Sequence, residues 1–161
     1  MRNVFKLFLA LSVLAVVLSL TACSFVSTFV VANESNDRIQ IRYVVKKGNN
    51  PEYPRSLPLI PGVMLISELD DGDRQWRNLS SPMLTYNETN RTAVITLMPN
   101  EAVRIEQVGE TLCEDIDKHY DRFEIEEISI TGASGTLRLT GEQVTKSFTA
   151  RSKQLCVLTY R

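Results

Sequence analysis

The chain has 161 residues, a length that suits one domain with its own apolar core. Its 18 Lys and Arg residues nearly balance its 19 Asp and Glu residues, which excludes the strongly basic surface typical of nucleic-acid binding. His119 is the only histidine, so a zinc site made mainly of histidines is excluded as well.

The first 22 residues have the pattern of a secretory signal. Arg2 and Lys6 are followed by residues 7–20, an uncharged run that is apolar apart from two serines. This run is shorter than the ~20 apolar residues that a membrane-spanning helix needs. We therefore expect residues 1–22 to direct export, to be removed and to contribute nothing to the fold.

Leu20, Thr21, Ala22 and Cys23 follow directly after the apolar run. These four residues match the lipobox, and through them the amino terminus resembles that of bacterial lipoproteins. An ordinary cleavage site has a small residue three positions before the cut, where this chain has Leu20. The resemblance implies that a diacylglyceryl group bearing fatty acids such as palmitate is attached to the Cys23 sulfur, and that the chain is cut after Ala22. The alternatives are a plain signal peptide, or an uncleaved signal anchor, with a chance cysteine.

The residues after Cys23 indicate in which membrane the protein would be anchored. In bacteria with two membranes, an Asp directly after the lipidated cysteine tends to retain lipoproteins at the inner membrane, whereas here Ser24 and Phe25 follow. The resemblance therefore implies the inner leaflet of the outer membrane, with the domain facing the periplasm. Two or more acyl chains hold a protein stably on a membrane. We expect residues 23–28 to form the lipidated cysteine and a short tether, and residues 29–161 to form the domain.

The other two cysteines, Cys113 and Cys156, are an even pair in an exported chain. An oxidising compartment favours a disulfide between them. The alternative is two reduced thiols, either buried or too far apart to bridge. Removing Arg2 and Lys6 with the signal leaves 16 basic and 19 acidic side chains, a net charge of about −3. We therefore expect the lipid, and not the surface charge, to make the membrane contact.

Alternating apolar and polar residues, typical of β-strands, recur along the rest of the chain. Two hairpins are expected, one from residues 27–32 and 38–46 and one from residues 92–98 and 102–108. Residues 47–61 contain four prolines and predict an extended loop. Residues 69–73 indicate an acidic turn, and residues 76–86 are ambiguous. Further strands are expected at residues 63–67, 123–131, 136–140, 145–150 and 155–160.

One of these strands predicts an irregularity. The apolar positions change parity between Ile125 and Ile128, and a β-bulge near Glu126 and Glu127 would turn both isoleucines to the same side. In all, about eight short strands with turns between them predict an all-β domain. We expect a single immunoglobulin-like β-sandwich.

Residues 110–120 have the only helical pattern, with Thr111 as the expected N-cap. His119 lies among acidic residues in this segment, so a metal-binding or acid–base cluster is conceivable there. The alternative is a solvated polar turn. The acidic residues are Glu114, Asp115, Asp117 and Asp121.

Three other patterns have both a functional and a structural interpretation. Asp70, Asp71 and Asp73 offer oxygen ligands for Ca²⁺, but they lack the spacing of an EF-hand, and an exposed turn is the alternative. Trp76, Tyr86 and the proline-rich loop either line a binding surface or belong to the core. Four glycosylation sequons are present, which in a bacterial chain indicate only polar turns; they begin at Asn33, Asn78, Asn87 and Asn90.

The last strands carry a second resemblance. Apolar residues alternate around two glycines and end in a tyrosine: Ile128, Ile130, Gly135, Leu137, Leu139, Gly141, Phe148, Leu158 and Tyr160. This arrangement resembles small bacterial β-sandwich lipoproteins, in which a strand–Gly–strand hairpin leads to a final strand ending in tyrosine. The resemblance covers about a quarter of the chain and implies a fold but no catalytic residue.

Catalytic signatures are missing from the sequence. It contains no G-x-S-x-G or S-x-x-K motif, and His119 is the only imidazole for a serine triad. We therefore expect a membrane-tethered, non-enzymatic binding or scaffolding module of the bacterial cell envelope, with an envelope protein as partner and no cofactor. The alternatives are a small-ligand or lipid carrier with a cavity in the sandwich and, more weakly, an envelope hydrolase with an unrecognised site.

Overall fold

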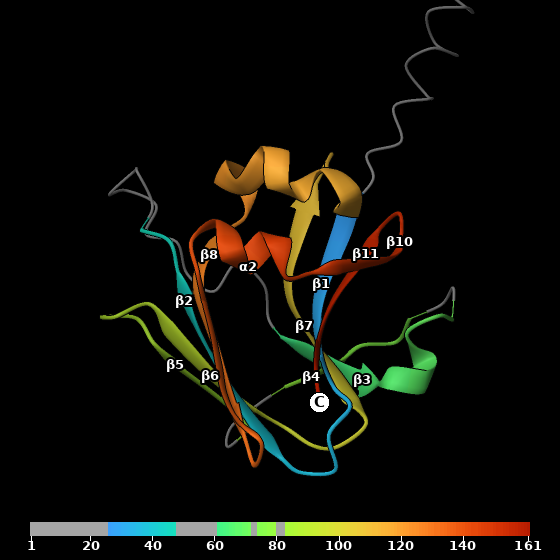
Figure 1. Cartoon of the computed structure of the whole chain (residues 1–161), viewed down its shortest axis with the longest axis vertical. Helices are drawn as coiled ribbons and strands as arrows, with labels where there is room; N and C mark the ends of the chain where they lie inside the picture. The colour runs from blue at the N-terminus through green and yellow to red at the C-terminus, as the bar shows by residue number, and fades with distance from the viewer. Residues whose placement is uncertain (1–25, 48–60, 72–73, 80–82) are drawn as a thin grey trace, which may run out of the picture.

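Two β-sheets pack face to face around one apolar core (Figure 1). The computed structural model describes residues 26–47, 61–71, 74–79 and 83–161. The six-stranded sheet has the order β10–β11–β1–β7–β3–β4, and the five-stranded sheet has the order β5–β6–β2–β8–β9. The expectation of an all-β domain is confirmed. Within the described ranges, no helix has the length and apolar character needed to span a membrane.

Short strands and three short helical segments make up the two sheets and their connections. The six-stranded sheet consists of β1 (Val26–Asn33), β3 (Gly62–Leu65), β4 (Arg77–Asn78), β7 (Glu101–Gly109), β10 (Thr149–Ser152) and β11 (Leu155–Tyr160). The five-stranded sheet consists of β2 (Ile39–Val45), β5 (Leu84–Asn87), β6 (Thr92–Leu97), β8 (Ile125–Gly132) and β9 (Gly135–Thr140). The helical segments are η1 (Ile66–Glu68), η2 (Cys113–Arg122) and α2 (Glu142–Lys146).

The described part of the chain thus holds eleven strands, where the sequence predicts about eight. Residues 76–86, which are ambiguous in sequence, contribute β4 and β5. The domain also begins earlier than expected. β1 starts at Val26, and both Ser27 and Thr28 are buried, so these residues belong to the sandwich and not to a tether.

The alternating pattern correctly predicts which side chains face the core. Ile39, Ile41, Tyr43 and Val45 of β2 are all fully or almost fully buried. The bulge is confirmed as well: Val44 pairs with Glu127 and Val45 pairs with Ile125, which leaves Glu126 without a cross-strand partner. As a result, both Ile125 and Ile128 point into the core.

Both expected hairpins are wrong. β1 and β2 belong to different sheets, and so do β6 and β7. β1 lies between β11, with which it pairs in parallel, and β7, with which it pairs in antiparallel, so neither of its edges is open to β2. β6 is likewise flanked by β5 and β2. The chain therefore crosses from one sheet to the other at both turns.

Asn33 holds these two crossings together. Its side chain is fully buried, and Nδ2 donates hydrogen bonds to the carbonyl oxygens of Asp37 (2.8 Å) and Leu97 (3.4 Å). Its Oδ1 accepts from the backbone N–H of Ser35 (3.1 Å), and its own carbonyl accepts from the N–H of Asn100 (2.9 Å). The Asn33 sequon is therefore part of a turn, and its carboxamide is used within the fold.

The helical predictions need two corrections. η2 begins at Cys113, later than the expected start at residue 110, and Leu112 rather than Thr111 precedes its first turn. Thr111 is buried, and its carbonyl accepts a hydrogen bond from the Ser27 hydroxyl, so it is part of the packing against β1. The strand expected at residues 145–150 starts only at Thr149, because α2 directs Val144 and Thr145 inward.

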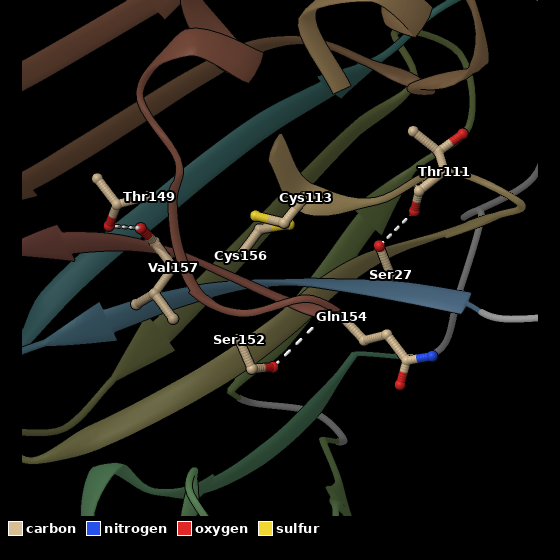
Figure 2. Close-up of a disulfide and its surroundings, with 8 residues drawn as sticks. All are labelled: Ser27, Thr111, Cys113, Thr149, Ser152, Gln154, Cys156 and Val157. Carbon is tan, nitrogen blue, oxygen red and sulfur yellow. Dashed lines mark hydrogen bonds between the residues drawn. A yellow bond between two sulfur atoms is a disulfide. The ribbon is translucent and has the colours of Figure 1, made fainter. Parts of the chain in front are cut away.

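A disulfide joins Cys113 to Cys156, as the cysteine count predicts (Figure 2). It links the start of η2 to β11, and the two Cα atoms are 5.5 Å apart. Both cysteines are buried. η2 is thereby fixed over the end of the sandwich at which β1 begins, where Val26 pairs with Gly109 (Figure 1).

Tyr160 closes the opposite end. Its hydroxyl donates to the carbonyl of Gly135 (2.9 Å) and accepts from the Ser134 hydroxyl (2.9 Å). A Cβ at Gly132 would lie 2.8 Å from Tyr160 Cε1 and 3.0 Å from Ile39 Cγ2. Only glycine at position 132 leaves space for the tyrosine ring in this orientation.

We expect Gly132→Ala to lower the free energy of unfolding by about 1–3 kcal/mol, because the new methyl group overpacks this contact. Gly109→Ala is the matched control, since nothing lies within 4 Å of a Cβ at that position. Urea unfolding measures both variants. Equal stability of the two would contradict this role of Gly132.

Replacing both cysteines, as Cys113→Ala with Cys156→Ala, should lower the free energy of unfolding by roughly 4 kcal/mol. The bridge closes a loop with a sequence separation of 43, and without it the unfolded chain regains that freedom. Chemically reduced wild-type protein should unfold at a similar urea concentration. Mass spectrometry of non-reduced protein should find the linked peptides, and two free thiols would refute the bridge.

Candidate functional site

A covering segment, residues 66–71 and 74–76, packs on the outer face of the six-stranded sheet. Alternate residues of a strand point to opposite faces, so Phe29 and Val31 of β1 enter the core while Val30 and Ala32 face outward. The outward side chains form a second apolar cluster around the fully buried Leu69, with Ile66 and Trp76 packed against it. The other members are Val30, Ala32, Met64, Ala102, Leu155 and Val157.

An ion pair ties the covering segment to β10. Arg151 Nε and Nη2 donate to the two carboxylate oxygens of Asp70 at 2.7 and 2.5 Å, and Arg74 Nε donates to the Leu69 carbonyl at 2.8 Å. The hydrogen bond from Arg151 holds the pKa of Asp70 below its usual value. This bidentate geometry is the strong form of an Arg–carboxylate contact.

The Ca²⁺ interpretation of this acidic turn is not supported. Asp70 is engaged by Arg151, and Gly72 and Asp73 lie outside the described residues. Among the residues that are described, no group of three or more Asp, Glu, His or Cys side chains is placed to hold a metal ion. Asp70 therefore makes a structural contact in this fold.

His119 is not part of a cluster either. It lies where η2 is kinked, with φ −127° and ψ 34°, and its acidic neighbours have other contacts or face solvent. Asp115 accepts a hydrogen bond from Lys118 Nζ at 2.7 Å, which lowers the pKa of Asp115 and raises that of Lys118. Glu114, Asp117 and Asp121 are exposed.

Trp76 packs against β3 and β7. Gly62 of β3 makes this possible, because a Cβ there would lie 2.8 Å from Trp76 Cβ and 3.4 Å from Arg104 Nη2. The Arg104 guanidinium lies over the Trp76 ring, with Cζ 5.3 Å from the ring centroid. Contacts of this kind between a guanidinium and an indole are attractive, and more so where water is partly excluded.

Among the described residues, Arg104 lacks the ion pair that several other arginines of the domain form. Its side chain is half-buried and its Nε is enclosed without a hydrogen-bond partner. No ion pair joins it to any residue in the described ranges, whereas Arg42, Arg77 and Arg151 each pair with a carboxylate. Burial lowers the pKa of the Arg104 guanidinium, which nonetheless remains charged.

A hollow of about 430 Å³ opens beside Trp76 on the same face. Its lining combines the indole with polar and charged side chains: Met64, Glu68, Asp71, Gln75, Trp76 and Arg77. Ligands usually bind in concave sites, and in this one four of the six lining residues are polar or charged. Arg104 is not part of the lining and is connected to the hollow through its contact with Trp76. We take Trp76, Arg104 and this hollow as the candidate site.

The sequence locates only part of this site. Trp76 is named as a surface candidate, but Tyr86 lies on β5 of the other sheet, and residues 48–60 of the proline-rich loop lie outside the described residues. Arg104 is missed, because an arginine in an alternating strand is normally an outward, solvated residue. Leu20, Thr21, Ala22 and Cys23 also lie outside the described residues.

Asp70→Asn should make the domain easier to unfold at neutral pH, by weakening the contact between the covering segment and β10. A carboxylate with a lowered pKa stabilises the fold above its unfolded value, here 3.8, and this stabilisation is lost as the pH falls through the lower folded value. The difference in urea midpoint between wild type and Asp70→Asn should therefore shrink below about pH 4. Asp71→Asn serves as the control, and a difference that is independent of pH would contradict the ion pair.

Comparisons with family models, with curated proteins and with solved structures find no match to this chain. Any function must therefore be inferred from the amino-terminal sequence and from the geometry of the domain itself.

Proposed function

We propose that the protein is a lipid-anchored, non-enzymatic binding or scaffolding module of a bacterial cell envelope. The lipobox residues Leu20, Thr21, Ala22 and Cys23 support the anchor. The observation that carries the binding role is the half-buried Arg104, which lies against Trp76 beside an open hollow and has no ion-pair partner among the described residues.

The short connection between anchor and domain supports a fixed orientation. Val26, the first residue of β1, is three residues after Cys23, so their Cα atoms lie within about 11 Å of each other in any conformation. At this end Val26 pairs with Gly109, and η2 is held nearby by its disulfide. A lipid on Cys23 would therefore place the η2 end of the sandwich next to the membrane.

The candidate site lies on the other half of the domain. Met64 lines the hollow and pairs with Ala102, which pairs in turn with Ala32 near the end of β1. Ala32 is about 20 Å along the strand from Val26. In the proposed orientation the hollow opens toward the compartment and remains accessible to an envelope partner, whose effective concentration the tether raises.

Location follows from the same proposal. Because Ser24 and Phe25 follow Cys23, we place the anchor in the inner leaflet of the outer membrane, with the domain in the periplasm. The net charge of about −3 after removal of the signal argues against nucleic acid as a partner.

We propose an immunoglobulin-like sandwich, supported by two mainly antiparallel sheets whose connections cross from one to the other. The space between the sheets is packed with aromatic rings: the centroid of Phe29 lies 4.8 Å from that of Phe123 and 5.2 Å from that of Phe148. This packing favours a surface site over a carrier cavity in the core.

Cys23→Ala tests the anchor. We expect this variant to accumulate as unprocessed precursor or to leave the membrane fraction, because the lipid can no longer be attached. Ser24→Ala, which keeps the cysteine, is the matched control and should be processed and fractionate as wild type does. Immunoblotting of membrane and soluble fractions provides the measurement. Normal processing of Cys23→Ala with unchanged membrane association would refute the lipoprotein assignment.

A further inference from the structure

No ion pair joins Arg104 to the described carboxylates around the site. Glu68 accepts from the N–H of Leu65 (3.1 Å), Asp70 binds Arg151, and Glu101 accepts from the N–H of Met98 (3.1 Å). Asp71, which lines the hollow, is exposed and forms no ion pair with Arg104. A half-buried cation without a partner costs free energy, which a bound anion would recover.

The geometry around Arg104 limits how an anion would approach. Nε is enclosed, so a ligand reaches the guanidinium through its two Nη atoms. A guanidinium presents parallel N–H groups that match the two oxygens of a carboxylate or phosphate. Because the side chain is half-buried beside the Trp76 ring, water screens this contact less than on an open surface.

Trp76 adds a second requirement. The indole is part of the lining of the hollow and lies against Arg104, so a ligand held at the guanidinium has an aromatic surface next to it. A flat apolar group attached to the anion would pack on this surface and remove apolar area from water. An anion without such a group would gain only the charge contact.

We propose that Arg104 and Trp76 bind an oxyanion, either a carboxylate or a phosphate, that is attached to a flat apolar group. This inference rests on the proposed binding function and names the class of ligand for that site. Arg104 holds the oxyanion and Trp76 packs against the attached group. Gly62 is the residue that allows the two side chains to meet.

The single tryptophan makes this proposal directly measurable. Trp76 is the only tryptophan in the chain, so both its fluorescence and its one indole N–H resonance report on this site alone. We would titrate the full processed chain, in neutral detergent, with benzoate, acetate, phenyl phosphate and inorganic phosphate. We expect saturable changes, with benzoate tighter than acetate and phenyl phosphate tighter than phosphate. The two pairs of probes distinguish a carboxylate site from a phosphate site.

Variants and a neutral probe complete the test. Arg104→Gln should weaken benzoate binding at least about tenfold, because charge-assisted hydrogen bonds are lost. Arg138→Gln, an exposed arginine on β9 of the other sheet that pairs with Glu127, is the matched control and should bind as wild type does. Benzamide has the same ring without the charge and should leave Trp76 unchanged in wild-type protein, which tests the proposal without any substitution.

Three outcomes would overturn the proposal: no saturable response to any of the four anions, equal binding of benzoate and benzamide, or unchanged benzoate binding in Arg104→Gln. Each can occur while Cys23→Ala still loses its membrane association. The ligand class and the anchored function are therefore tested separately.

Discussion

The buried carboxamide of Asn33 is the contact on which the arrangement of the two sheets depends. Asn33 ends β1 at the point where the chain leaves the six-stranded sheet, and Nδ2 reaches the carbonyl of Leu97, where the chain leaves the five-stranded sheet. Its own carbonyl accepts from Asn100 at the start of β7. One residue thus makes hydrogen bonds with backbone groups of both crossings. With the crossings fixed, β1 can lie between β7 and β11.

At the opposite end of the sandwich, a carboxylate and a disulfide hold the segment that connects the two sheets. Glu106 of β7 is buried and accepts hydrogen bonds from the backbone N–H groups of Gln107 (3.0 Å) and Glu124 (3.3 Å). Glu124 lies between η2 and β8, so Glu106 connects one sheet to the segment that enters the other. Burial, with a smaller contribution from the charge of Glu106, raises the pKa of Tyr43. The Cys113–Cys156 bridge fixes the start of η2 at the same end (Figure 2).

The candidate binding site lies on the outer face of the six-stranded sheet. The covering segment packs on the apolar cluster of that face through Leu69 and is held by the ion pair between Asp70 and Arg151. Arg104 lies against Trp76 and forms no ion pair within the described ranges. If Cys23 carries a lipid, as we propose, the two residues between it and Val26 would orient the domain so that this face is reached from the compartment and not from the lipid.

The sequence by itself determined the local features. It predicts the strands from their alternation, the inward residues of β2, the bulge at Glu126 and the pairing of Cys113 with Cys156, because each depends on residues close in the chain or on a simple count. Only the tertiary structure decided which strands pair, since the edges of β1 are occupied by strands from the middle and the end of the chain. It alone also brought Gly62, Trp76 and Arg104 together, because they meet across β3 and β7, and no local pattern encodes that contact.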